Sequence, residues 1–402
     1  MTILNMNLLK ALARRKSAGL TGMKRRKWHG ARTLSVLLAI ALAACRSGPP
    51  EASSAGEGTD NTEAFELEKQ LVLQNATLNQ ADDNGEPLWR IHADLVTYSP
   101  DRRDADLENL TGNLYEDGEI ALQIVSERGR IVDAGELVRL EGEVIATDVR
   151  NELSLHAEIA EWFPERDLLI VRQNLRGTHS RFEIAAREGH YQTLNERLEL
   201  RGEVLGLSED PPLRLQAERL FWSLPNELVT SEDPIAIERY QEDVITDRVD
   251  ADRAAVDLAT REVRLNENVT LRSTEPPMQI VSNAILWLVD ARLVLAEEPV
   301  RADRRDNNTI VTGDRGEFDL ENEVATLEGR VEGTNRDDAR LFADRLEWDI
   351  PGERVEATGN VIYEQSDPPV TTAGETAVGN LAKSTVVVRS GNAAPVVTEF
   401  MP

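Results

Sequence analysis

The sequence of 402 residues contains a single cysteine, Cys45, so it can form no internal disulfide bond. Histidine is also scarce, with five in the whole chain, and aromatic residues make up only 4%. No Cys-x-x-Cys, His-Glu-x-x-His, Gly-x-Ser-x-Gly or phosphate-loop motif occurs. These absences remove the usual signatures of metal, thiol and nucleophile chemistry, so we expect neither catalysis nor a cofactor.

An excess of positive charge occurs only in the first 44 residues. The chain has a formal charge of −27, yet residues 1–44 contain nine Lys or Arg and no Asp or Glu. Removing these nine positive charges from −27 leaves −36 for residues 45–402. A body this acidic repels nucleic acids and anionic surfaces, so we expect no nucleic-acid partner. Solubility alone explains the charge equally well.

Long apolar runs are missing too. The apolar run that begins at Thr33 covers about 12 residues, whereas a membrane span needs about 20. It follows the basic segment Lys24–Lys27 and ends in Leu42-Ala43-Ala44-Cys45, an order that predicts a secretory signal at 1–44, with Met23 as an alternative start. Leu-Ala-Ala-Cys resembles the bacterial lipoprotein box, which implies lipidation of Cys45. A transmembrane anchor and a chance cysteine are the alternatives.

The rest of the chain carries an internal repeat. Five segments each contain an alanine, then an aromatic residue five positions later (three in the fourth segment) and then a turn. The aromatic residues are Tyr98, Trp162, Trp222, Trp287 and Trp348, separated by 64, 60, 65 and 61 residues. Between them lies a second motif, of the type Leu140-Glu-Gly142-Glu-Val144, which recurs with Val204, Val269, Val331 and Val361. The last step is 30 residues, so we expect units of about 30 residues in a repeat architecture.

Polar and apolar residues alternate around these motifs, as in 139–145 and 197–204. A period of two predicts strands with one buried face, and Pro, Gly, Asn and Asp at 133–136, 164–167, 224–227 and 350–353 predict turns. We therefore expect an all-β protein of stacked antiparallel strands, elongated and two-walled. Such a stack has two open ends, which can join another chain by strand pairing.

Segment 71–119 resembles the start of the periplasmic domain of the LptC family. The resemblance lies in an early apolar strand, Gly85 and Trp89, Ala93, the aromatic Tyr98, and a later strand ending at Tyr115. The Gly-x-Val motifs are similar to the OstA-like repeats that LptC shares with LptA and LptD. The similarity is clearest over 64–150, and the repeat extends it to about residue 365.

This resemblance implies an antiparallel β-jellyroll with a V-shaped cross-section and a role in lipopolysaccharide transport. Its groove would take lipid A acyl chains from the subunits of an inner-membrane ABC exporter and pass them to an LptA-like bridge protein by edge-strand pairing. Two features depart from the family. The chain is a long, diverged form, and a lipid anchor would replace the usual transmembrane helix.

Eight repeat residues are candidates for lining the lipid groove. They are Trp162, Trp222, Trp287, Trp348, Val144, Val204, Val269 and Val331. The alternative is that they fill a closed core, as in an outer-membrane lipoprotein scaffold of β repeats without lipid cargo. The alternation of polar and apolar residues is the same whether the apolar face contacts lipid or other protein side chains.

Two of the histidines, His92 and His156, occupy the same repeat position, which repetition explains better than a metal ion. A hidden pair of carboxylates, as in a polysaccharide-degrading β-solenoid enzyme, is the remaining catalytic alternative. No cluster of carboxylates with aromatic residues stands out from the repeat, which favours a protein that is not an enzyme.

The predicted organisation has five parts. They are the signal (1–44), the lipidated cysteine with a flexible tether rich in Gly, Ser, Pro and Glu (45–63), the LptC-like β domain (64–150), further OstA-like repeats (151–370) and a C-terminal tail (371–402) with one strand at 384–389. The family role places the anchor on the periplasmic side of the inner membrane. Arg46 is not the Asp that causes retention there in enteric bacteria, so the outer membrane stays open as the alternative.

Overall fold

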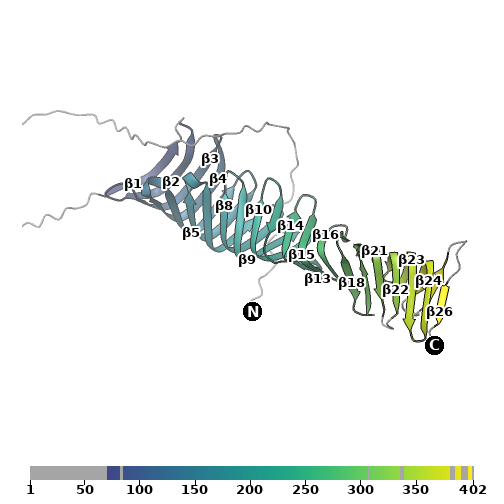
Figure 1. Cartoon of the computed structure of the whole chain (residues 1–402). Helices are drawn as coiled ribbons and strands as arrows, with labels where there is room; N and C mark the ends of the chain where they lie inside the picture. Colours follow the sequence, from purple (N-terminus) through teal and green to yellow (C-terminus); the bar gives the residue numbers. More distant parts are fainter. Residues whose placement is uncertain are drawn as a thin grey trace, which may run out of the picture. The chain divides into compact units, whose positions relative to one another are not determined.

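The computed structural model describes residues 70–81, 85–306, 308–335, 339–380, 385–390 and 397–400. They belong to one compact unit, Glu66–Pro402, and form a single antiparallel sheet of 26 strands (Figure 1). The all-β prediction is confirmed. The predicted signal 1–44, Cys45 and the tether to residue 63 lie outside the described residues. Within the described ranges, no helix has the length and apolar content needed to cross a membrane.

The strands follow one another along the chain with two short 3-10 helices between them. The first group is β1 (Leu71–Ala81), β2 (Pro87–Tyr98), β3 (Ala105–Glu116), β4 (Glu119–Val132), η1 (Asp133–Gly135), β5 (Leu137–Asp148), β6 (Leu153–Phe163), η2 (Pro164–Arg166), β7 (Leu168–Thr178), β8 (Phe182–Gln192), β9 (Arg197–Glu209) and β10 (Pro212–Ser223). The second group is β11 (Leu228–Ser231), β12 (Ile235–Gln241), β13 (Val244–Ala251), β14 (Arg253–Asp257), β15 (Glu262–Thr274), β16 (Pro277–Leu288), β17 (Leu293–Ala296), β18 (Val300–Arg304), β19 (Thr309–Gly313) and β20 (Arg315–Asp319). The last group is β21 (Val324–Thr334), β22 (Arg340–Asp349), β23 (Arg354–Ser366), β24 (Pro369–Asn380), β25 (Thr385–Arg389) and β26 (Val397–Phe400).

Each strand from β1 to β10 pairs with the next one along the chain. We call each position in the order of the sheet a rung. Up to β10 one strand fills each rung, but further along the chain some rungs consist of two short strands that lie end to end. Thus β11 and β12 both pair with β10, and β13 and β14 both pair with β15. The same split recurs at β17 with β18. Two successive rungs occupy about 30 residues, which confirms the predicted unit, although its strands are longer than the short ones expected.

Each rung bends near its middle, and the bends form one crease along the sheet. The strand register shifts at this point in rung after rung, for example between Glu141 and Val144 and between Glu328 and Val331. The residues between have left-handed backbones, such as Gly142 with φ 79° and Glu143 with φ 41°. Such bulges bend a strand and increase its twist. The crease therefore divides the sheet into two walls.

The recurring Gly-x-Val motif is explained by the crease. In β21, Leu327 faces the interior on one wall, Gly329 and Arg330 make the left-handed bulge, and Val331 faces the interior on the other wall. The two apolar residues are four positions apart, so both point inward, and the bulge between them bends the strand from one wall to the other. The motif is thus required by the fold itself, before any question of cargo arises.

Gly329 gives a direct test of the crease. Its φ of 75° disfavours any side chain, and a Cβ there would lie 2.7 Å from Asp314 Oδ2. Gly329→Ala should therefore lower the free energy of unfolding by about 1–2 kcal/mol, measured by urea unfolding. Gly333→Ala on the same strand is the matched control, because its Cβ would meet nothing closer than 3.8 Å. Equal losses in the two variants would contradict the role given to the bulge.

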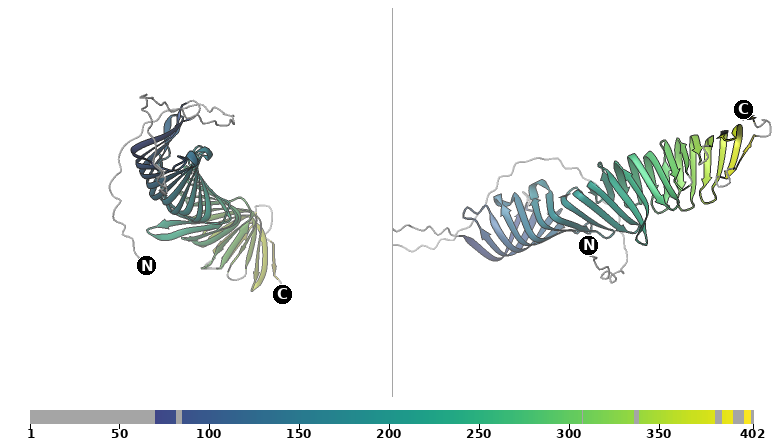
Figure 2. Two further views of the ribbon diagram at one scale, coloured as in Figure 1. Left: turned by 90° about the vertical axis from the view of Figure 1, so that its left-hand side faces the viewer. Right: turned by 90° about the horizontal axis from the view of Figure 1, so that it is seen from below.

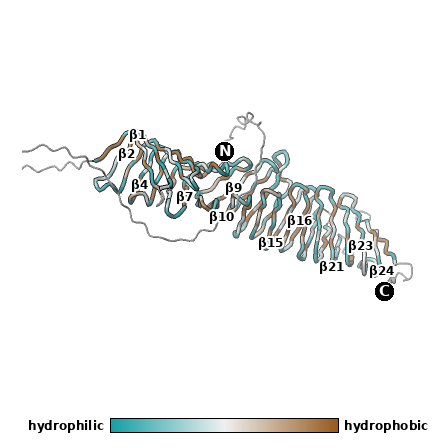
Figure 3. Tube along the Cα trace, turned by 90° about the horizontal axis from the view of Figure 1, so that it is seen from above, coloured by the Kyte–Doolittle hydropathy of each residue, from teal (hydrophilic) through white to brown (hydrophobic). Residues whose placement is uncertain are grey.

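The two walls enclose the apolar core. We call the wall that carries Val144, Val204, Val269 and Val331 the valine wall, and the other, which carries Trp162, Trp222, Trp287 and Trp348, the tryptophan wall. Figure 2 shows the rungs following one another with a progressive twist, and Figure 3 shows apolar and polar residues alternating along them. Inward-facing residues of both walls form one continuous hydrophobic cluster from Trp89 to Ala377.

The sheet continues through the predicted domain boundaries. Strands β5 and β6 pair on either side of residue 150, and β24 runs across residue 371. Strand β25 lies where a strand is predicted at 384–389. At the two ends of the described sheet, β1 pairs only with β2, and β25 and β26 pair only with β24.

Candidate functional site

All eight predicted groove residues face the interior between the walls. Each is at most 5% exposed, and all belong to the same apolar cluster. Each of the four tryptophans is the next-to-last residue of its strand and they recur on every fourth rung, whereas the four valines sit beside the crease. The structure therefore brings the eight residues together along one interior. Cys45 lies outside the described residues.

The interior is tightly packed over much of its length. From β15 to β22, inward-facing residues such as Val263, Ile280, Trp287 and Trp348 are completely buried. From β8 to β14 the packing is looser, because Phe182 and several inward-facing leucines are only half-buried. The sequence motifs do not distinguish these two parts of the repeat.

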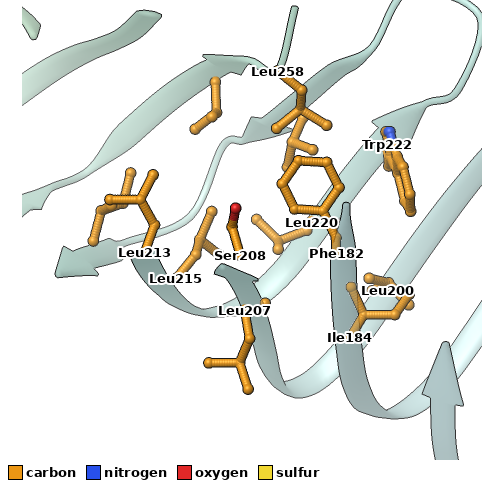
Figure 4. A pocket seen from close by; sticks show the side chains of 14 residues that line it. Phe182, Ile184, Leu200, Leu207, Ser208, Leu213, Leu215, Leu220, Trp222 and Leu258 are labelled. Carbon is orange, nitrogen blue, oxygen red and sulfur yellow. The ribbon is translucent and has the colours of Figure 1, made fainter. Parts of the chain in front are cut away.

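An apolar hollow occupies this looser part. It is lined by Phe182, Ile184, Leu200, Gly206, Leu207, Ser208, Leu213, Leu215, Leu220, Trp222, Val229, Ile237, Val256 and Leu258 (Figure 4). Its cavity volume is about 70 Å³. Ser208 supplies the only side-chain hydroxyl of the lining, and apart from it and the Trp222 indole nitrogen every lining side chain is hydrocarbon. A guest in the hollow would therefore have to be apolar.

Small residues on β9 open the hollow. Gly206 follows Val204 on the valine wall, and the corresponding residue after Val269 is Leu271, which is completely buried. A Cβ added at Gly206 would meet only Leu215 Cβ, at 3.7 Å. The space that a leucine fills in one repeat is thus left empty in another. This glycine is the signal in the sequence that could have revealed the hollow.

Three aromatic rings border the hollow near the wall tips, which are the ends of the strands farthest from the crease. His179 stacks on Phe182 with ring centres 6.1 Å apart and an interplanar angle of 16°. The ring of Trp222 stands edge-on to both, at 5.3 Å from His179 and 6.1 Å from Phe182. Burial lowers the pKa of His179, and the neighbouring Arg181 lowers it further. The imidazole is therefore neutral at pH 7.

A second, polar cavity lies directly beyond these rings. We call it the mouth cavity, and its volume is about 260 Å³. Its lining consists of Arg150, Asn151, Glu152, His179, Ser180, Arg181, Trp222, Leu224, Glu227 and Leu258. Trp222 and Leu258 line both spaces, so the hollow and the mouth cavity adjoin. Together they offer an apolar chamber with a polar entrance.

Arginines bridge the tips of the two walls at intervals. Arg150 on the valine wall donates to the Thr193 carbonyl oxygen on the tryptophan wall at 2.9 Å, and Arg304 reaches the Ile350 carbonyl oxygen at 2.5 Å. Arg181 pairs with Glu227 beside the mouth cavity, and Arg261 pairs with Asp210 at 3.2 Å. These contacts hold the walls together where their turns would otherwise be free to separate.

The bridge at Arg150 includes a buried carboxylate. The side chain of Asp148 is 1% exposed and accepts hydrogen bonds from Arg150 at 2.8 Å and from the Tyr191 hydroxyl at 2.5 Å. Burial alone would raise the pKa of Asp148, but these two donors lower it overall. The stabilisation from Asp148 is therefore complete above about pH 4 and is lost as the pH falls through this lowered pKa.

Arg150→Ala should cost about 3 kcal/mol of unfolding free energy, because it leaves the buried Asp148 carboxylate without its cation. Glu116 and Glu196 lose the same partner. Urea unfolding measures the loss. Arg139→Ala is the matched control, since Arg139 pairs with Glu141 at 3.0 Å on an exposed surface and should lose less than about 1 kcal/mol. A loss from Arg150→Ala no larger than that of the control would contradict the bridge.

The described residues offer little for metal or acid–base chemistry. Among them, no group of three His, Cys, Asp or Glu residues could hold a metal ion. His92 contacts Thr77 at 3.2 Å and His156 contacts Ser154 at 3.3 Å, each within the sheet. The hollow and the mouth cavity both have room for a guest, and these favour binding.

Comparison with known proteins points to one family. No curated protein matches the chain. The family model described as LptC, "Lipopolysaccharide-assembly, LptC-related", matches residues 36–204 and 214–336, which is most of the chain. The match includes segment 71–119 and confirms the resemblance found there. The chain belongs to the LptC family of lipopolysaccharide-assembly proteins.

Proposed function

We propose that this protein transports lipopolysaccharide by holding the acyl chains of lipid A between its two walls. The apolar hollow of β8–β14 carries the proposal, because the interior leaves room for a guest there and the lining is almost entirely hydrocarbon. Membership of the LptC family supports lipopolysaccharide as the cargo. Because the surface is acidic, it does not attract an anionic headgroup. The acyl chains therefore supply most of the binding free energy.

The energetics favour such a path. Each methylene of an acyl chain that leaves water for an apolar site gains about 0.8 kcal/mol. A hollow of about 70 Å³ is about half the size of an apolar cavity that binds benzene, so it holds the end of one chain. A longer stretch requires the walls to separate. Trp222 already lines the hollow, and the other seven predicted residues would reach lipid when the walls move apart.

The placement in the envelope is part of the proposal. Cys45 would carry the lipid anchor on the periplasmic side of the inner membrane, with residues 46–63 as the tether. The N-terminal sheet, over 64–150, would receive lipid from the ABC exporter, and the repeats over 151–370 would continue the path. The free edges at β1 and at β25 with β26 suit strand pairing with an LptA-like partner.

Depletion of the protein in its host tests the proposal. Newly made lipopolysaccharide should accumulate in the inner membrane and fail to reach the cell surface, as measured by pulse labelling and membrane fractionation. Re-expression of the wild-type chain should restore surface delivery. Normal delivery after depletion would contradict transport and favour an outer-membrane scaffold without lipid cargo. The closely packed rungs β15–β22 would suit such a scaffold equally well.

A further inference from the structure

The indole N–H of Trp222 is a buried donor without an acceptor. Trp222 is 5% exposed, and its Nε1 has no hydrogen-bond partner among the residues that the structure describes. Leaving such a group unpaired costs free energy that a suitable guest would recover. Figure 4 shows this nitrogen at the end of the ring away from Leu200 and Ile184, which form a deep part of the hollow.

This donor lies at a boundary between two environments. Trp222 lines the apolar hollow on one side and the polar mouth cavity on the other. An acylated molecule has groups of matching polarity in the same order: a hydrocarbon chain, then the carbonyl of an ester or amide linkage, and then a polar head. With the chain in the hollow, its carbonyl oxygen falls at the boundary, where the free N–H can donate to it.

The mouth cavity suits an uncharged, hydroxyl-rich head. His179 is neutral at pH 7, so it adds no charge to the cavity, and its Nδ1 already accepts from the Arg181 backbone N–H at 3.4 Å. Ser180 and Asn151 add neutral polar groups, while Arg181 is already paired with Glu227. With its cations committed to carboxylates, the cavity gives no preference to an anion. Sugar hydroxyls match these groups.

We propose that the hollow and the mouth cavity form one binding site for an acylated sugar, in which the Trp222 indole N–H donates to the carbonyl of the acyl linkage. The inference rests on the proposed function, since it takes an acyl chain in the hollow for granted. The additional element is a hydrogen bond that recognises the acyl linkage and fixes how far the chain enters the hollow. Trp222 is then a positioning donor as well as a wall residue.

Two related tryptophans provide controls. The Nε1 atoms of Trp287 and Trp348 are also buried without partners, but these residues lie where the interior is tightly packed. Among the described residues, Trp222 is the member of this group that lines the hollow and the mouth cavity together. Trp287→Phe therefore removes the same chemical group without touching the site.

The test compares two detergents with a twelve-carbon chain and a disaccharide head, used below their micelle concentrations. Sucrose monolaurate has an ester carbonyl, whereas dodecyl maltoside has an ether link in its place. Calorimetry on the full chain should give about fivefold tighter binding for the ester, the value of one hydrogen bond. Trp222→Phe should bring the ratio of the two affinities to about one, whereas Trp287→Phe should keep the wild-type ratio.

Nuclear magnetic resonance of the 15N-labelled full chain gives a second readout. The Trp222 indole proton should move downfield with the ester and not with the ether. Equal binding of both detergents by the wild-type chain, or a preference that survives Trp222→Phe, would overturn the linkage site while leaving acyl binding intact. Failure of both detergents to bind would overturn the linkage site and the lipid-binding function together.

Discussion

Replacing Gly206 with leucine should weaken lipopolysaccharide binding by about a hundredfold. The new side chain would enter the hollow from β9, where a Cβ has free space, and would displace about four methylenes of a bound chain. At about 0.8 kcal/mol for each methylene, the loss is about 3 kcal/mol. Binding of purified lipopolysaccharide to the isolated protein measures it.

Gly206→Ala is the graded control for this variant. A single methyl group fits beside Leu215 Cβ at 3.7 Å and displaces at most about one methylene, so binding should fall by no more than about fourfold. Ser208→Leu fills the same hollow from a neighbouring position and should reproduce the loss. Circular dichroism should give the same strand content and unfolding midpoint in all three proteins. Unchanged binding in folded Gly206→Leu and Ser208→Leu would mean that the hollow does not hold the cargo.

Trp287→Ala should lower the free energy of unfolding by about 3–5 kcal/mol. Trp287 is completely buried on β16, between Val263 and Val294 on the neighbouring rungs, so the change leaves a large cavity. In a stack whose units contact only their neighbours, the damage stays local. Hydrogen exchange should therefore speed up in β15–β17 and change little in β2–β5.

Val244→Ala is the control for this variant, because Val244 is 63% exposed and its loss should stay within about 0.5 kcal/mol. A small effect of Trp287→Ala, similar to that of the control, would show that the interior near β16 is not packed in solution. The closed part of the core would then have to be open to guests as well.

The sequence predicts the fold well because its signals are local and repeated. Alternation of apolar residues defines the inward face of each rung, and the step of 30 residues from Val331 to Val361 gives the length of the unit. The turns at 133–136, 164–167, 224–227 and 350–353 all fall where the tryptophan wall ends. Each of these features depends on neighbours within one or two rungs, so pattern and structure agree.

The site is harder to predict because it depends on contacts between the walls. Whether the interior is full or hollow depends on one missing side chain at Gly206 and on what faces it across the gap. The bridge from Arg150 joins residues 43 positions apart, without any motif to mark it. The Gly-x-Val motif, in turn, is explained by the crease between the walls and does not mark a binding site. The residues that best mark a site for cargo are thus glycine, serine and half-buried leucines, which attract no attention in a sequence.

The most direct test of the central claim is site-specific photo-crosslinking in the host envelope. A photoreactive residue at Leu215 would lie in the hollow, and one at Val244 would lie outside it, at the exposed start of β13. We expect lipopolysaccharide adducts at Leu215, none at Val244, and loss of the Leu215 adduct when Gly206→Leu is present in the same chain. Absence of adducts at Leu215 in a correctly localised protein, or equal adducts at both positions, would contradict the proposal that acyl chains occupy the space between the walls.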